Sequence, residues 1–192
     1  MSAPDRPGFT DPVADAQACF RAVLDAMARP GTVHEAGANL SPPAPLDPAT
    51  ASVLLTLVDG DVPLWLDGDV AAAWPWLAFH CGAARCDSLD QAAFACARTA
   101  PPLSDLPSGT DAEPEESATL VLQIPAIGSG RRFTLSGPGL AERASLSVAG
   151  LAADFAAQWA ANHALYPRGI DLILCAGEHL CALPRSVRIE EA

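Results

Sequence analysis

Arginines and acids at the ends of predicted elements are the residues best suited to hold a charged ligand. Arg29 stands where a predicted helix ends, Arg185 follows a predicted strand, and Asp171 lies one residue inside another strand. A guanidinium group binds carboxylate or phosphate oxygens in pairs, and α/β folds place ligands at the ends of their elements. We therefore take these three residues as candidate ligand-binding residues. The favoured alternative is an internal Arg–Asp pair that ties a strand to a loop.

A second candidate is the run Gly128-Ser129-Gly130-Arg131-Arg132, which resembles an anion-binding loop. Its glycine N–H groups lie beside two guanidinium groups, a combination that could hold phosphate. A phosphate loop normally opens a helix, however, whereas this run lies between two predicted strands. We therefore favour a hairpin tip, in which the glycines supply positive φ angles and turn residues 119–124 back onto 132–136.

Histidine and cysteine pairs suggest zinc but lack its usual spacing. His80-Cys81 stands near Cys86, and Cys175 stands near His179 and Cys181, yet no Cys-x-x-Cys pair occurs. Cys175 and Cys181 also fall inside apolar strand patterns, where a buried thiol packs well. We expect no metal site.

The basic residues exclude several classes of function. All eleven are arginine, so the chain can supply neither the amine of a pyridoxal-phosphate Schiff base nor the lysine of a P-loop. Twenty-three acidic residues give a formal net charge of -12, which repels polyanions. We therefore expect no nucleic acid and no anionic membrane surface among the partners.

The expected compartment is the cytoplasm. Residues 1–8 contain no apolar segment of the kind that a signal peptide needs. The most apolar stretch, residues 70–84, is interrupted by Pro75 and His80 and is too short to span a bilayer. The six cysteines are therefore expected to be reduced thiols.

Two Asp-Pro pairs indicate where helices begin. Asp11-Pro12 and Asp47-Pro48 each place an N-cap carboxylate before a proline at the first helical position, where the missing N–H costs nothing. Apolar residues at helical spacing then predict helices over about 12–28 and 48–58. A third helix is predicted over about 150–164.

Strand-like runs alternate with helices over the first hundred residues, which favours an α/β fold. In the second half, one hairpin is expected at 128–130 and another at 176–178. The sheet is therefore expected to be mixed. The predicted strands span residues 32–35, 62–66, 93–98, 119–124, 132–136, 170–175 and 180–183.

The length of 192 residues suits one compact domain. We expect residues 1–10 to form a flexible N-terminal tail and residues 11–192 to form a single α/β domain. The polar segment 99–117 is expected to be a surface loop. Trp74 and Trp76 are candidate interface residues if they flank an exposed apolar patch, with core packing as the favoured alternative.

Several segments resemble one known family when their order and spacing are taken together. They are residues 11–13, 15–17, 20–21, 27–31, 108–110, 118–123, 135–140, 166–174 and 183–186. These segments resemble the phosphonate-metabolism H protein family, whose members are subunits of the bacterial carbon-phosphorus lyase core complex. The resemblance extends from about Phe9 to Glu190.

The resemblance implies a three-layer α/β/α sandwich with a mixed sheet. That fold is similar to the large domain of pyridoxal-phosphate-dependent transferases, without pyridoxal phosphate or any other cofactor bound by this chain. The resemblance further implies a homodimer when the protein is isolated, and the G, I and J subunits of the complex as partners. ATP is then a substrate of the complex. The resemblance supplies no catalytic residue in this subunit.

Two functions from different classes follow. The first is an accessory subunit, not catalytic alone, that is needed for ATP-dependent formation of ribose 1-methylphosphonate 5-triphosphate with release of adenine. The second is a free-standing nucleotide or sugar-phosphate binding protein or enzyme, suggested by Arg29, Arg185 and the glycine-rich turn. A purely structural scaffold is a third class, which differs from the first only if buried charged sites are dispensable for activity.

Overall fold

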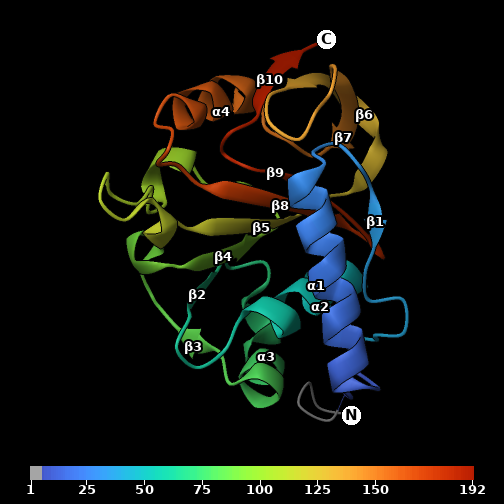
Figure 1. The fold of residues 1–192 in the computed structure, drawn as a ribbon. Helices are drawn as coiled ribbons and strands as arrows, with labels where there is room; N and C mark the ends of the chain where they lie inside the picture. Colours follow the sequence, from blue (N-terminus) through green and yellow to red (C-terminus); the bar gives the residue numbers. More distant parts are fainter. Residues whose placement is uncertain (1–5) are drawn as a thin grey trace.

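A seven-stranded mixed sheet forms the centre of the protein, whose computed structural model describes residues 6–192 (Figure 1). The five strands β3, β2, β4, β5 and β8 are parallel, whereas at one side β9 pairs antiparallel with β8 and β1 pairs antiparallel with β9. The expectation of a mixed sheet is therefore confirmed. In spatial order the strands are β1 (His34–Glu35), β9 (His179–Leu183), β8 (Asp171–Ala176), β5 (Thr119–Gln123), β4 (Phe94–Ala97), β2 (Pro63–Leu66) and β3 (Ala84–Arg85).

Three helices cover one face of this sheet: α1 (Pro12–Ala28), α2 (Pro48–Leu57) and α3 (Trp74–Cys81). Side chains of a strand alternate between the two faces, so Val121 of β5 and Ile173 of β8 point to the helical side. There they share one core with buried residues of the helices. The helical residues fully buried in this core include Ala26, Ala49, Ala51, Val53, Leu54, Trp76 and Leu77.

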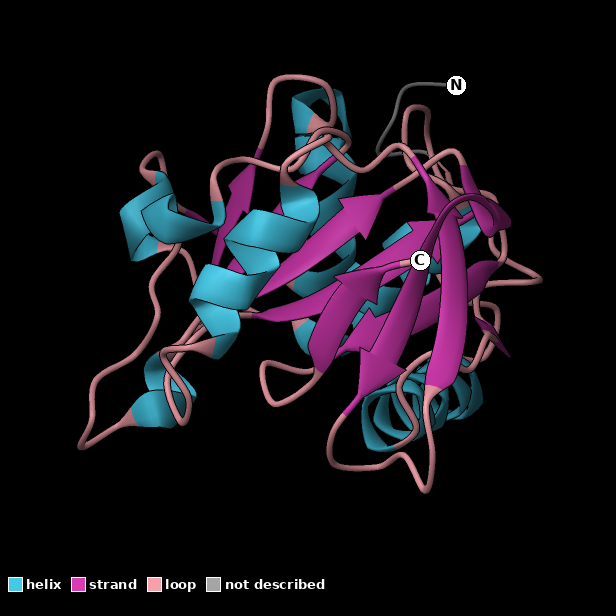
Figure 2. Ribbon diagram, turned by 90° about the horizontal axis from the view of Figure 1, so that it is seen from above, coloured by secondary structure: helices cyan, strands magenta, loops and turns pink. Residues whose placement is uncertain are grey.

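The opposite face is covered by helix α4 (Phe155–His163) and a second, three-stranded antiparallel sheet (Figure 2). The second sheet has the order β10 (Arg188–Glu191), β6 (Ala126–Ser136) and β7 (Ala144–Ala149). Leu120 and Leu122 of β5 pack on this side with Phe133, Phe155 and Trp159. The molecule therefore has three layers, but one outer layer is mostly strand where a helical layer was expected. Apolar residues at every second position of β6 and β7 fit that layer, because alternation suits a strand with one buried face.

The predicted helix starts are confirmed, although the two caps differ. The Asp11 carboxylate accepts hydrogen bonds from the backbone N–H groups of Val13 and Ala14, at 3.2 and 3.0 Å. Asp47 precedes α2 as predicted, but its carboxylate accepts from the backbone N–H of Gly177, 3.0 Å away in the β8–β9 turn. The second cap thus joins a helix to a distant hairpin.

The prediction of a hairpin at residues 128–130 is wrong. The strand ending at Gln123 stays in the large sheet, and β6 runs from Ala126 through the glycines without turning. A register shift between Ile127 and Arg131 marks an irregularity of the bulge type, because extra residues of β6 lie opposite Val148 of β7. The glycines supply the positive φ that was expected, but they serve to bend a strand.

Other observed element boundaries differ from the predicted ones by a few residues. The predicted helix over 150–164 begins only at Phe155, because β7 runs to Ala149 and Gly150 has a φ of 91° that no helix contains. The predicted β8–β9 hairpin is confirmed, with Gly177 in the left-handed region. Four short 3-10 helices complete the described elements: η2 (Ala71–Ala73), η3 (Leu89–Gln91), η4 (Leu103–Asp105) and η5 (Pro114–Glu116).

Residues 1–5 of the expected flexible tail lie outside the described residues, and the rest of the tail packs against α3. The Arg6 carbonyl accepts hydrogen bonds from Trp76 Nε1 at 3.1 Å and from His80 Nε2 at 2.9 Å. Phe9 packs against the core on the same side. In the described part of the chain, no helix combines the length and the apolar character that crossing a membrane would need.

Candidate functional site

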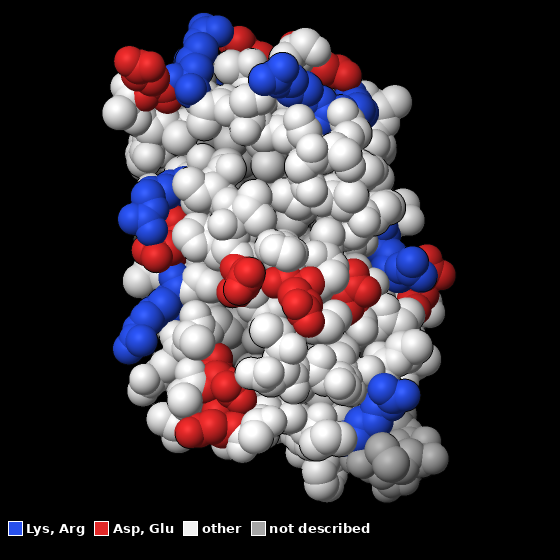
Figure 3. All heavy atoms as spheres, turned by 90° about the vertical axis from the view of Figure 1, so that its right-hand side faces the viewer, with Lys and Arg blue, Asp and Glu red and all other residues white. Residues whose placement is uncertain are grey.

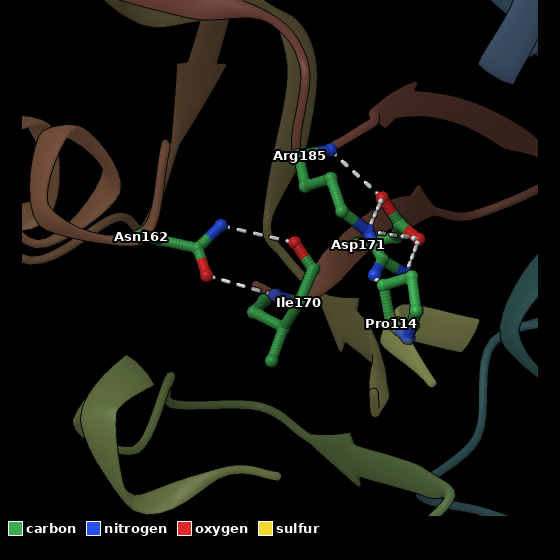
Figure 4. Close-up of polar contacts among 5 residues, drawn as sticks. All are labelled: Pro114, Asn162, Ile170, Asp171 and Arg185. Atoms are coloured by element: carbon green, nitrogen blue, oxygen red, sulfur yellow. Dashed lines mark hydrogen bonds and ion pairs between the residues drawn. The ribbon is translucent and has the colours of Figure 1, made fainter. Parts of the chain in front are cut away.

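Asp171 and Arg185, two of the three candidate ligand residues, bind each other (Figure 4). Arg185 Nη2 lies 2.5 Å from Asp171 Oδ2, and the Arg185 backbone N–H donates to Asp171 Oδ1 at 2.7 Å. Arg185 Nη1 donates to the Pro114 carbonyl at 2.6 Å. Only 16% of the arginine side chain and 21% of the aspartate side chain are exposed. The guanidinium group is therefore occupied by internal acceptors, as the alternative interpretation predicted.

The location of this pair also favours a structural role. Asp171 begins β8, so it lies at the amino end of the parallel strands, whereas open α/β sheets bind ligands beyond the carboxyl ends. The pair joins the start of β8 to the segment after β9, and the Pro114 contact adds the loop that contains η5. It therefore holds three segments that are far apart in the sequence.

Asn162 makes a second tie directly beside this pair (Figure 4). Its Nδ2 donates to the Ile170 carbonyl at 3.0 Å, and its Oδ1 accepts from the Ile170 N–H at 2.8 Å. Asn162 is buried, so both halves of its amide are satisfied by one residue of the backbone. Gly169 is necessary here, because a Cβ at that position would lie 2.9 Å from the Asn162 side chain and backbone carbonyl oxygens. The end of α4 is thus fixed to the start of β8.

Arg29, the third candidate, is not brought to the other two. It caps the end of α1 and forms an exposed ion pair with Asp25, one turn earlier, at 2.9 Å. Among the described residues it has no hydrogen bond or ion pair with Asp171 or Arg185. The three candidates therefore do not form one site.

The arginines of the glycine-rich run are also used internally. Arg131 pairs with Glu191 of β10 at 2.8 Å and donates to the carbonyls of Ala152 and Ala153. The Arg131 guanidinium holds the pKa of the Glu191 carboxyl below its usual value. Arg132 donates to the Ser145 hydroxyl at 2.9 Å. Both guanidinium groups therefore bind neighbouring segments of the small sheet and of the loop after β7.

The candidate interface tryptophans occupy different environments. Trp76 is completely buried and its indole N–H donates to the Arg6 carbonyl, so this residue packs in the core. Trp74 is half-buried, and the Arg85 guanidinium carbon lies 5.7 Å from its ring centroid. The exposed aromatic side chain of α3 is Phe79, which is 71% exposed.

The cysteines lie apart from any metal-binding arrangement within residues 6–192. No three His, Cys, Asp or Glu side chains come together there in the way a metal ion requires. All six cysteines are free thiols, and burial raises the pKa of Cys96, Cys175 and Cys181, in the last case to about 12. A thiol that stays protonated is a poor nucleophile and a poor metal ligand.

A cavity that the sequence reasoning missed lies between the end of α4, the end of β6 and β10, which adjoin in Figure 1. Its volume is about 850 Å³. His163 and Arg188 border it, and Arg188 Nε donates to His163 Nε2 at 3.0 Å. The signal in the sequence was weak, because β10 was not predicted and a helix-end histidine also has a simple dipole explanation.

The surface charge fits the acidic composition. On the face shown in Figure 3, arginine side chains lie mainly toward the margins, and acidic side chains lie across the middle. No continuous basic stripe crosses this face. A polyanion such as a nucleic acid would meet mainly repulsion there.

This architecture defines an α/β protein whose strongest polar contacts hold its own segments together, and comparison with known proteins identifies the family. Residues 7–190 match the family model described as bacterial phosphonate metabolism protein (PhnH), and the chain belongs to that family.

Two relatives support this membership. The Rhizobium meliloti (strain 1021) protein named alpha-D-ribose 1-methylphosphonate 5-triphosphate synthase subunit PhnH is 39% identical over 187 residues, which cover 95% of this chain and 94% of that protein. The Stutzerimonas stutzeri protein named putative C-P lyase subunit protein HtxG is 30% identical over 180 residues, covering 90% of this chain and 85% of that protein. The resemblance drawn from the collinear segments is thereby confirmed.

Proposed function

We propose that this protein is a subunit of the bacterial enzyme that forms ribose 1-methylphosphonate 5-triphosphate in phosphonate breakdown. The observation that carries the proposal is the end-to-end match to the Rhizobium meliloti subunit, which leaves no large segment of either chain unmatched. The relative from Stutzerimonas stutzeri, named putative C-P lyase subunit protein HtxG, supports a role in phosphonate breakdown.

The proposed reaction is a displacement at the ribose C1 atom of ATP. A phosphonate oxygen of methylphosphonate forms the new bond to C1, and the C1–N9 bond to adenine breaks. The products are adenine and ribose 1-methylphosphonate 5-triphosphate, with the triphosphate retained. We infer that this chain assists the reaction without catalysing it alone, because the arginines at its predicted sites are bound to internal acceptors.

The proposed partners are the G, I and J subunits of the complex, and the proposed state of the isolated protein is a homodimer in the cytoplasm. Supporting this assignment, both relatives carry names of subunits. A formal net charge of -12 favours partner surfaces that are basic, because complementary charge speeds and orients association.

We also infer that the fold is similar to the large domain of pyridoxal-phosphate-dependent transferases, without their chemistry. The large mixed sheet with helices on it is compatible with that architecture. The cofactor needs a lysine amine for its Schiff base, and this sequence contains no lysine.

Reconstitution tests the proposed function directly. The purified protein is mixed with ATP and methylphosphonate, with and without the proposed partner subunits, and released adenine is measured by chromatography. We expect adenine only when this chain and its partners are all present. Adenine release by this protein alone, or full activity of the partners without it, would contradict the proposal.

A further inference from the structure

In a chain without lysine, arginines are the only side chains with a fixed positive charge, so those without a carboxylate partner are the best candidates to bind an anion. Six arginines form ion pairs with carboxylates among the described residues: Arg29, Arg85, Arg131, Arg143, Arg168 and Arg185. Arg188 has no carboxylate within 4.0 Å in the described part of the chain, and it borders the cavity between α4, β6 and β10. It is therefore the arginine best placed to meet a ligand.

The Arg188 guanidinium is held in place by His163. The Arg185 carbonyl can only accept a hydrogen bond, so His163 Nδ1, 3.0 Å away, must be the donor. Arg188 Nε can only donate, so His163 Nε2, also 3.0 Å away, must accept. Both contacts are satisfied by the tautomer that donates from Nδ1 and accepts at Nε2. Only Nε of Arg188 is used, and within residues 6–192 its two terminal amino groups have no protein acceptor.

Three side chains with hydroxyl groups border the same cavity as Arg188. Ser136 of β6 pairs directly with Arg188 of β10 in the antiparallel ladder, so their side chains lie on the same face of the small sheet. Ser186 and Tyr166 also border the cavity, and Tyr166 is 61% exposed. The three hydroxyl groups have no hydrogen-bond partner among the described residues. The cavity therefore offers a cationic fork and several neutral donors to one ligand.

We propose, resting on the proposed function for the class of ligand, that this cavity binds the tetrahedral oxyanion of a small organic phosphonate or phosphate. The terminal amino groups of Arg188 can donate to two oxygens of such a group, and the Ser136 and Ser186 hydroxyls, which border the same cavity, can donate to a third. The acidic residue of the lining, Glu190, lies 3.7 Å from Arg143, which offsets part of its charge. One guanidinium beside one carboxylate suits a compact anion of low charge better than a triphosphate.

Binding to the isolated full-length protein tests this proposal without any partner subunit. Isothermal titration with methylphosphonate, inorganic phosphate and ATP separates the possible sources of the anion, and acetate is the carboxylate control. We expect methylphosphonate and phosphate to bind saturably and to compete with each other, ATP to bind more weakly, and acetate not to bind. Absence of saturable methylphosphonate and phosphate binding overturns the proposal, and tighter binding of ATP overturns the preference for a compact anion.

Variants then locate the site. Arg188→Ala should weaken binding by roughly tenfold to a hundredfold, the usual effect of losing charge-assisted hydrogen bonds. Arg132→Ala is the matched control, because Arg132 lies exposed on the same small sheet but does not border the cavity. Thermal melts of both variants confirm that they fold. Equal affinity in the two variants would refute the assignment to Arg188.

Amide shifts in NMR spectra provide a measurement on the unmodified protein. Methylphosphonate should shift the signals of Ser136, Gly137 and Ser186 and the ring signals of His163. Shifts spread over exposed arginines elsewhere would overturn the proposal. The result is separable from the reconstitution assay, because the isolated chain either binds the anion here or does not, whatever the assembled complex does.

Discussion

At the scale of single residues, the Asp171–Arg185 pair shows how a residue type suited to ligands can serve the fold. The guanidinium satisfies both carboxylate oxygens of Asp171 and the Pro114 carbonyl at once. A ligand would have to displace these contacts before it could bind. The pair is thus better described as a structural contact that connects three segments of the chain than as an anion site.

Removing the Arg185 side chain from this pair should destabilise the protein. Arg185→Ala removes the guanidinium from a largely buried carboxylate and from the Pro114 carbonyl, while the backbone N–H of residue 185 still donates to Asp171, and we expect a loss of about 2 kcal/mol in the free energy of unfolding. Urea titration followed by tryptophan fluorescence measures it.

Arg29→Ala is the control for this prediction, because it removes an exposed ion pair on α1. Its effect should stay within about 0.5 kcal/mol. Equal losses in the two variants would contradict a structural role that depends on burial.

At the scale of elements, the bulged strand β6 depends on one glycine more than on another. Gly128 and Gly130 have φ angles of 93° and 96°, so alanine is strained at either position. A Cβ at Gly130 would lie 2.5 Å from the Val148 carbonyl oxygen, whereas a Cβ at Gly128 would meet nothing within 4 Å. The two positions therefore share the backbone strain and differ in the available space.

We expect Gly128→Ala to cost about 1 kcal/mol and Gly130→Ala to cost about 1 to 3 kcal/mol more, from the clash with backbone. Chemical denaturation of both variants measures the difference. If the two alanine variants were equally stable, the bulge would have to sit elsewhere in β6.

How much of these elements the sequence could predict depended on whether the signal was local. The starts of α1 and α2 were predictable, because an Asp-Pro pair acts within one turn of helix. The role of Gly128 and Gly130 was not, since positive φ suits both a hairpin and a bulge, and the choice depends on β7 and β10, which lie further along the chain.

The candidate residues follow the same rule. Asp171 and Arg185 lie at adjoining ends of neighbouring antiparallel strands, so an internal pair could be anticipated from the predicted β8–β9 hairpin. His163 and Arg188 meet only because α4 packs beside β10 in the second sheet. Two strands of that sheet, β7 and β10, were not predicted from the sequence, so the contact could not be anticipated.

At the scale of the whole molecule, the absence of lysine changes how stability depends on alkaline pH. Lysine is absent, and the one tyrosine, Tyr166, is exposed, so the cysteines are the main buried groups that titrate above neutrality. Burial raises the pKa of Cys19, Cys96, Cys175 and Cys181. In the unfolded chain the same thiols ionise near their ordinary pKa, at about 8.5.

Stability from this source is complete below that ordinary pKa and is lost as pH rises toward the folded pKa, because only the unfolded state releases protons. We expect the free energy of unfolding to fall above about pH 9, by about 1 kcal/mol per pH unit for each thiol that stays protonated in the fold. Urea titrations under reducing conditions at several pH values measure this slope.

The control for this slope is Cys181→Ala, whose own titration is removed while five thiols remain. Its slope should be smaller than that of the unmodified protein by one thiol's share. A free energy of unfolding that does not fall with pH above about 9 in either protein would contradict the prediction.

The path of the chain after α4 has a consequence for the timing of folding. Strand β8 lies inside the large sheet between β9 and β5, and β10 then completes the small sheet beside β6. Domains fold largely as units during synthesis. Neither sheet of this protein can be completed until residues 171–192 have left the ribosome. Until then the edge of β5 that later pairs with β8 is unpaired, and it can pair with other chains in the cell.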